Sequence, residues 1–327
     1  MTDSLEQKIL NTLAWFDIFF MPLTKEETYR HLLHTDADTQ IPMASLDEIA
    51  RMLNTMAERY MIGHKHGLYF LPRRDALVGV RQRNMLIVEK KMKIAVRGAR
   101  LMRWIPFVDA VFVCNTVASG TADIESDIDL FVVIRDQRLW LARLLVVGLL
   151  SVFRLRRVGT HISDRLCLSF FVTDAHLDLT DTRIDERDVY LAYWIDQLVP
   201  VYDPMNVDAR IRAGNGWIRT MIPNAVHSVQ TLHRWRVNDW KPQLLLKHFF
   251  ERAWASGYGD TLEQQAKLIQ KKKMERNRGS KQHEQSTAVV ISNTMLKFHE
   301  HDRRAYFRDE WKQVCANIRT VRNYEKN

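Results

Sequence analysis

Apolar residues recur at helical spacing in three stretches near the N-terminus, and they alternate over a short fourth one. Residues 5–19, 23–33 and 45–62 carry apolar side chains three or four positions apart, which predicts three helices. The second and third of these stretches begin with Thr or Ser followed three residues later by Glu, which is the capping-box pattern of helix starts. Residues 62–72 alternate around two glycines and end in proline, which predicts a short hairpin.

The order of these elements, three helices and then a two-stranded wing, resembles a winged helix-turn-helix domain over residues 1–74. The resemblance is topological, because the sequence shows no base-reading signature. Winged helices dock proteins as well as read DNA, and a fold alone does not determine a function.

The next part of the chain alternates between helical and strand patterns. The long, basic, amphipathic segment of residues 73–106 comes first, and we expect it to pack on the sheet domain that follows. Strand, loop, strand, helix and strand in this order describe an α/β sheet domain, which we expect to end near residues 200–204. The predicted elements are one long helix or two helices over 73–106, strands over 108–114 and 127–134, a helix over 137–155 and a strand over 164–174.

From residue 206 onward the pattern is mostly helical and rich in Trp and basic residues. Residues 233–254 interleave Trp, Arg and Lys, which we interpret as a helical core of Trp, Phe and Leu with basic positions outside. Stacking of nucleic acid bases on these residues is the other interpretation. Residues 296–307 are interpreted as a salt-bridged helix start, or alternatively as a segment whose Lys297 or Arg303 meets phosphate. The sequence thus predicts three domains, over residues 1–74, 75–205 and 206–327.

The composition indicates which partners and which compartment suit these domains. The net charge of +9 favours anionic partners such as nucleotides, nucleic acid or an acidic membrane face, and does not choose among them. The three cysteines form no CxxC pair, which fits a reducing cytosol, and the N-terminus has no signal-peptide pattern. The most apolar stretch, residues 139–153, is too short for a bilayer span of ~20 residues. We therefore expect a cytoplasmic protein without a transmembrane segment.

Two acids at the start of a predicted strand are the strongest chemical signal. Asp127 and Asp129 point to one side because side chains alternate along a strand, while Ile128 and Leu130 point into the core. Two carboxylates this close repel each other unless a cation lies between them. Mg²⁺ suits this position because it binds hard oxygen ligands and keeps waters or phosphates for its other positions. The other interpretation is an edge strand that happens to begin with two acids.

The loop before these acids has the composition of a phosphate-binding turn. Gly120 allows the backbone to come close to a ligand, and Thr116 and Ser119 offer hydroxyl groups. A helix that starts after Thr116 would direct free N–H groups at a phosphate.

The combined stretch NTVASGTADIESDIDLFVVI, residues 115–134, resembles the signature of the polymerase-beta-like nucleotidyltransferases. In that superfamily a strand ends in Gly-Ser, a short helix-turn follows, and the next strand begins Asp-apolar-Asp-apolar. The resemblance covers about residues 108–173 and implies a mixed sheet with flanking helices. It also implies Mg²⁺- or Mn²⁺-dependent transfer of a nucleoside monophosphate from an NTP to a hydroxyl or phosphate acceptor, which the sequence does not identify.

The resemblance assigns roles to particular residues. Catalysis and metal binding fall on Asp127 and Asp129. Nucleotide contacts fall on the loop residues Asn115, Thr116, Ser119, Gly120 and Ser126.

The sequence also departs from the family pattern. Asn115-Thr116 replaces Gly-Ser, and the family's third carboxylate, on the neighbouring strand, corresponds to Ser169, which cannot act as a base. Asp164 or Asp174, at the ends of that strand, or a group of the substrate itself are the available substitutes. The alternative function is therefore a catalytically degenerate relative that binds nucleotide or nucleic acid in a regulatory role.

Overall fold

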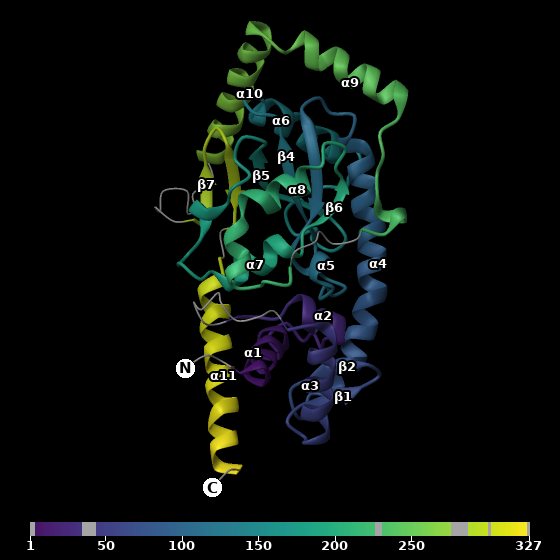
Figure 1. The fold of residues 1–327 in the computed structure, drawn as a ribbon. Helices are drawn as coiled ribbons and strands as arrows, with labels where there is room; N and C mark the ends of the chain where they lie inside the picture. The colour runs from purple at the N-terminus through teal and green to yellow at the C-terminus, as the bar shows by residue number, and fades with distance from the viewer. Residues whose placement is uncertain (1–3, 35–43, 226–230, 276–286, 300–301, 326–327) are drawn as a thin grey trace.

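The computed structural model describes residues 4–34, 44–225, 231–275, 287–299 and 302–325. Within these residues the chain is a mixed α/β protein built on a six-stranded mixed sheet (Figure 1). A smaller helical unit, formed by the N-terminal residues, lies against one end of it.

The N-terminal unit contains the elements that the hydrophobic pattern predicts. Ser and Thr side chains cap all three helices, and the second and third have complete capping boxes, as predicted. The predicted order of three helices followed by a hairpin is thus confirmed. The winged-helix assignment stays a prediction. The elements are α1 (Leu5–Asp17), α2 (Lys25–Arg30), α3 (Leu46–Glu58), β1 (Gly63–Lys65) and β2 (Leu68–Phe70).

The central sheet has the strand order β6-β3-β4-β5-β8-β7. Only β4 and β5 are parallel neighbours, and the chain connects them through a helix, as a parallel pair requires. Every other neighbouring pair in this sheet is antiparallel. The strands are β3 (Val108–Val113), β4 (Ile128–Ile134), β5 (Leu166–Thr173), β6 (Val199–Tyr202), β7 (Val289–Ile291) and β8 (Met295–Phe298).

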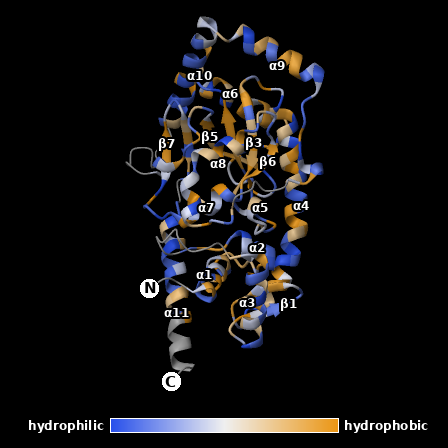
Figure 2. Ribbon diagram, viewed as in Figure 1, coloured by the Kyte–Doolittle hydropathy of each residue, from blue (hydrophilic) through white to orange (hydrophobic). Residues whose placement is uncertain are grey.

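Helices cover both faces of the sheet, and the strands are accordingly apolar on both sides (Figure 2). One face packs on the long linking helix and on the helix that joins β4 to β5. The other face packs on helices after β5 and, beyond them, on the N-terminal unit. The remaining helices are α4 (Ala76–Met102), α5 (Asn115–Ser119), α6 (Leu139–Val152), α7 (Val189–Asp196), α8 (Val207–Gly214), α9 (Lys241–Ala253), α10 (Gly257–Glu275) and α11 (Arg304–Glu325), with 3-10 turns at Thr180–Thr182, Gly216–Thr220 and His233–Trp235.

The C-terminal part differs from the expectation of a purely helical region. Its β7–β8 hairpin extends the sheet by pairing β8 with β5. Its last helix, α11, packs on the N-terminal unit, where the Trp311 indole donates to the Asn11 carbonyl at 2.9 Å. One hydrophobic core therefore draws on residues from all three predicted domains, and the domain boundaries themselves stay a prediction.

A buried carboxylate ties the N-terminal unit to the sheet region. Asp196, at the end of α7, has a fully buried side chain. Arg30 from α2 donates to it at 2.8 Å, and Arg212 from α8 approaches it at 3.4 Å. His31 lies 3.2 Å from the same carboxylate. His31 and then Arg30 lower the pKa of Asp196 to about 2, because their attraction outweighs the effect of burial.

Candidate metal and nucleotide site

The start of β4 brings the two predicted acids together. Asp127 precedes the strand, Asp129 is its second residue, and the fully buried Ile128 and Leu130 anchor the opposite face. Because β4 and β5 are parallel and in register here, Asp129 lies beside Cys167. Ligand atoms of Asp127, Asp129 and Cys167 all lie within 4.8 Å of one another. Among the described residues this is the only group of three or more such side chains with a spacing that suits a metal ion.

The third position of this cluster corrects the sequence-based expectation. Cys167, and not Ser169, is the residue of β5 next to the two acids. The two proposed substitutes are engaged elsewhere. Asp164 accepts hydrogen bonds from Lys90 at 2.6 Å and from Lys91 at 3.0 Å, and Asp174 accepts the backbone N–H of Asp136. No described carboxylate therefore takes the third position.

The thiol of Cys167 is a neutral group at physiological pH. Burial, together with the negative charges of Asp129 and Asp127, raises its pKa to about 12. A thiol that stays protonated is a poor ligand for a hard cation, because metals bind the thiolate form.

The two acids lie in different electrostatic surroundings. Burial, followed by the charge of Asp127, raises the pKa of Asp129 to about 6, and a hydrogen bond from Asn115 partly opposes this rise. Asp127 instead accepts a hydrogen bond from the Arg157 guanidinium at 2.6 Å. One positive charge from the chain itself therefore already faces the two acids.

The backbone of the loop explains two of the predicted residues. Asn115 begins α5 with a φ of 54°, in the left-handed region that glycine and asparagine tolerate best. Its side chain accepts the Trp194 indole N–H at 2.8 Å and also bonds Asp129, so it connects α7 to the acid pair. Gly120 ends α5 with a φ of 80°, where a side chain would strain the backbone. Helix α5 thus begins one residue before Thr116 rather than after it.

The three predicted hydroxyl residues are not gathered around the acids. Thr116 and Ser119 line a smaller cavity of about 150 Å³ that lies toward the aromatic residues of α1 and α7. Ser126 lies inside its own turn, where its hydroxyl donates to Asp123 Oδ1 at 2.8 Å. Asn115, Tyr190, Trp194 and Phe307 line both this cavity and the larger one described next.

A cavity of about 580 Å³ opens beside Asp129. Asn115, Asp129, Cys167 and Ser169 contribute to one part of its wall. The segment from β8 to the start of α11 contributes another part, which includes Lys297, His299 and Arg303, and aromatic side chains of α7 and α11 complete the lining. The predicted salt-bridged helix start over residues 296–307 is confirmed in its second half, where α11 begins at Arg304 and Arg304 pairs with Asp302. Its first half is instead the end of strand β8. Contact of Lys297 or Arg303 with phosphate stays a prediction.

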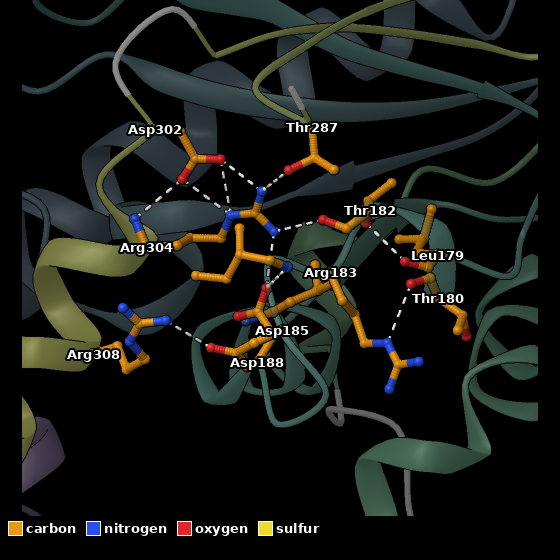
Figure 3. A network of polar contacts seen from close by, with 12 residues as sticks. Leu179, Thr180, Thr182, Arg183, Asp185, Asp188, Thr287, Asp302, Arg304 and Arg308 are labelled. Atoms are coloured by element: carbon orange, nitrogen blue, oxygen red, sulfur yellow. Dashed lines mark hydrogen bonds and ion pairs between the residues drawn. The ribbon is translucent and has the colours of Figure 1, made fainter. Parts of the chain in front are cut away.

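Arg304 anchors this segment (Figure 3). Its guanidinium is almost fully buried and donates through all three nitrogens, to Asp302, to Asp188, to the Thr182 carbonyl and to the Thr287 hydroxyl. Its hydrogen bonds are thus committed to holding the start of α11 on α7. The sequence alone did not show this anchor, because two of its partners, Thr182 and Asp188, lie more than a hundred residues away.

The remaining cations of the cavity differ in availability. Lys297 donates to the Thr287 carbonyl at 2.7 Å, and burial lowers its pKa to about 8. Arg303 is exposed, with its guanidinium 4.8 Å from the ring centre of Tyr306. Arg157 is half-exposed on the other side, above Asp127. Arg303 and Arg157 are therefore the cations best placed to meet an anionic ligand.

The donor set suits one Mg²⁺ or Mn²⁺ ion. Two carboxylates with adjacent oxygens provide hard ligands, and one or two carboxylates plus substrate phosphates is the usual protein set for Mg²⁺. The pKa of Asp129 is raised first by burial and then by the charge of Asp127, and a cation bound between the two acids would oppose both effects. Within the described residues a second ion lacks a ligand set, because the third position holds a neutral thiol.

This chain matches no protein-family model, no curated protein and no solved structure. The case for a function therefore rests on the side chains of the site. Among its described helices, none has both the length and the apolar composition needed to cross a bilayer.

Proposed function

We propose that this protein is a divalent-metal-dependent nucleotidyltransferase that binds an NTP in the cavity beside Asp129. The observation that supports this proposal best is the approach of Asp127 to Asp129, which lines a cavity that is also lined by exposed cations. A metal ion held by the two acids would neutralise negative charge on the triphosphate and on the departing pyrophosphate.

The chain's own residues divide the remaining tasks. Arg157 and Arg303 are placed to contact phosphate oxygens, since guanidinium groups pair well with phosphates. Trp194, Tyr190 and Phe307 offer aromatic faces for the base in the same cavity. The cavity volume of about 580 Å³ is in the range of small-molecule sites.

In the superfamily the third carboxylate removes the proton of the acceptor hydroxyl. Among the described residues of this chain no carboxylate takes that position, so another group must act as the base. His299 is the candidate for this task, because its Nε2 lies 3.4 Å from Ser169 Oγ in the same cavity as Asp129. Burial, together with the charge of Lys297, lowers its pKa to about 4. The imidazole is therefore neutral at neutral pH and can accept a proton, although a pKa of about 4 makes it a weaker general base than a histidine with its usual pKa.

The direct test uses NTPs labelled at the α-phosphate, with Mg²⁺ or Mn²⁺ and a panel of hydroxyl and phosphate acceptors. Asp129→Asn should abolish label transfer, whereas Glu125→Gln is the matched control, because Glu125 is an exposed carboxylate of the same loop. His299→Gln should lower the turnover number while leaving NTP binding intact. If no NTP binds and no label moves to any acceptor, the proposal fails.

A second function is favoured by one observation, the ion pair between Arg157 and Asp127. In this alternative the guanidinium takes the place of the metal, and the protein binds nucleotide or nucleic acid without turnover. Metal-independent NTP binding without label transfer would favour it. A strongly salt-dependent affinity for DNA or RNA that survives the loss of both acids would favour nucleic acid as the ligand.

A further inference from the structure

Helix α9 faces the protein with its polar side. Gln243, Lys247 and Glu251 are spaced four residues apart, so they form one stripe, and all three are buried. The Gln243 amide donates to the Arg103 carbonyl at 2.6 Å. Lys247 donates to the Val108 carbonyl at 2.6 Å. These contacts fix which face of the helix points inward.

Glu251 completes this stripe and shows why it is polar. Its carboxylate accepts the backbone N–H of Phe107 at 2.9 Å and pairs with Arg135 at 3.2 Å. The surface beneath α9 is the entry into β3, where backbone groups outside the sheet ladder need partners. Polar residues of α9 satisfy them.

The outward side of α9 is consequently apolar. Leu245 is 73% exposed, Phe249 is 64% exposed and Leu246 is 44% exposed, and Trp240, just before the helix, is 54% exposed. The sequence-based interpretation of residues 233–254, with Trp, Phe and Leu inside and basic residues outside, is therefore wrong for these four side chains. It is confirmed for Trp235 and Trp254, which pack on the core, and for Lys241 and Arg252, which are exposed. In Figure 1, α9 lies with α10 at the end of the molecule opposite the N-terminal unit.

The charges on this outward side have one sign. Lys241 and Arg252 are exposed at the two ends of the helix, and the only acid of α9 is the buried Glu251. If two copies paired antiparallel through α9, Lys241 would face Arg252 of the other copy, which opposes self-association. An apolar strip of Trp, Leu and Phe between cations is the composition of helices that lie in the plane of an anionic membrane surface.

We propose that the outward face of α9, with Trp240, is a docking surface for an anionic lipid bilayer. Leu245, Leu246 and Phe249 enter the boundary between headgroups and acyl chains, while Lys241 and Arg252 contact lipid phosphates and carboxylates. The convex position of α9 suits a flat bilayer, which needs no groove to receive it. This inference is independent of the proposed enzymatic function.

The experiment is co-sedimentation of the full chain with vesicles of phosphatidylcholine alone, or of equal parts phosphatidylcholine and phosphatidylserine. The wild type should bind only the phosphatidylserine vesicles, and more weakly as salt is added. Leu245→Glu and Phe249→Glu should each weaken binding about tenfold, the scale expected from withdrawing one large apolar side chain from lipid. Arg252→Glu should weaken it through charge and leave the apolar strip intact.

Leu86→Glu on α4 is the matched control, because Leu86 is 77% exposed and lies outside α9. It should bind vesicles like the wild type, and all variants should keep the wild-type thermal unfolding midpoint since the changed side chains are exposed. The proposal is overturned if the wild type does not bind anionic vesicles, or if the α9 variants bind as the control does. It is also overturned if the α9 variants instead dissolve a dimer, which would identify a second copy as the partner.

Discussion

Replacing Arg157 by Gln tests whether this side chain competes with a metal ion for Asp127. The Arg157 guanidinium donates to Asp127 Oδ2 at 2.6 Å, so a divalent ion that uses Asp127 must displace it or share the carboxylate with it. Gln at this position keeps a polar side chain and removes the positive charge. We therefore expect Arg157→Gln to bind Mn²⁺ more tightly than the wild type does.

The size of the effect follows from the exposure of the pair. A hydrogen bond to a charged group contributes about 1.5–3 kcal/mol when shielded, and an exposed ion pair contributes about 0.2–1 kcal/mol. The Arg157 side chain is 43% exposed and that of Asp127 is 17% exposed. We therefore assign this ion pair a contribution between the two ranges, about 1 kcal/mol. Since ~1.4 kcal/mol corresponds to a factor of ten, Mn²⁺ affinity should rise about fivefold.

The same substitution should act in the opposite direction on the nucleotide. Arg157 lines the cavity and is a candidate phosphate contact, so Arg157→Gln should weaken NTP binding while it tightens Mn²⁺ binding. Mn²⁺ binding is measured by electron paramagnetic resonance of the free ion, and NTP binding by calorimetry. Arg154→Gln is the control, because it removes an equal charge from an exposed side chain nearby. Equal Mn²⁺ affinities in the two variants would refute the competition.

Three further substitutions test other parts of the structure. Asp196→Asn should lower the free energy of unfolding in urea by about 2 kcal/mol at neutral pH. The pKa of Asp196 is about 2 in the folded protein, below the usual aspartate value of 3.8. The loss of stability should therefore be complete above that usual value and should vanish as the pH falls from about 4 to about 2. Gly120→Ala should lower the free energy of unfolding by about 1–2 kcal/mol in the same assay, because alanine is strained at the φ of 80° that Gly120 adopts. Gly148→Ala, inside α6, is the control and should cost no stability. Equal losses in the two variants would contradict this reasoning. Cys167→Asp should lower the thermal midpoint without metal, and Mn²⁺ should then raise it more than in Ser169→Asp; equal Mn²⁺ shifts would argue against the three-residue cluster.

The sequence predicted the parts of the fold that local chemistry determines. Both capping boxes form as their spacing predicts, since each involves residues only three positions apart. The strands β3, β4 and β5 fall within the predicted ranges because each is an apolar run that is bounded by polar residues. The pairing of Asp127 and Asp129 likewise depends only on the alternation of side chains along one strand.

The missed parts depend on contacts between residues that are distant in the chain. The β7–β8 hairpin has strands of three and four residues, and its place in the sheet comes from pairing with β5, more than a hundred residues earlier. The orientation of α9 depends on unsatisfied backbone groups near Phe107 and Val108, which select the polar stripe of the helix. An apolar stripe usually faces inward, and no pattern within α9 shows that its neighbour is polar.

The third position of the acid cluster is the clearest case in which the sequence alone did not predict the structure. The parallel pairing places Asp129 opposite Cys167 but Phe131 opposite Phe170, so the register shifts by one residue between these pairs. Such an irregularity is invisible in the sequence, and a shift of one residue turns a strand's side chains to the other face. Cys167 and Ser169 lie two residues apart and line the same cavity, so the pairing of β5 with β4, and not the alternation along β5, decides that a thiol with a pKa of about 12 lies beside the two acids. Any transfer chemistry at this site must then take its base from outside β5, and His299, delivered by the unexpected strand β8, is the described side chain positioned to supply it.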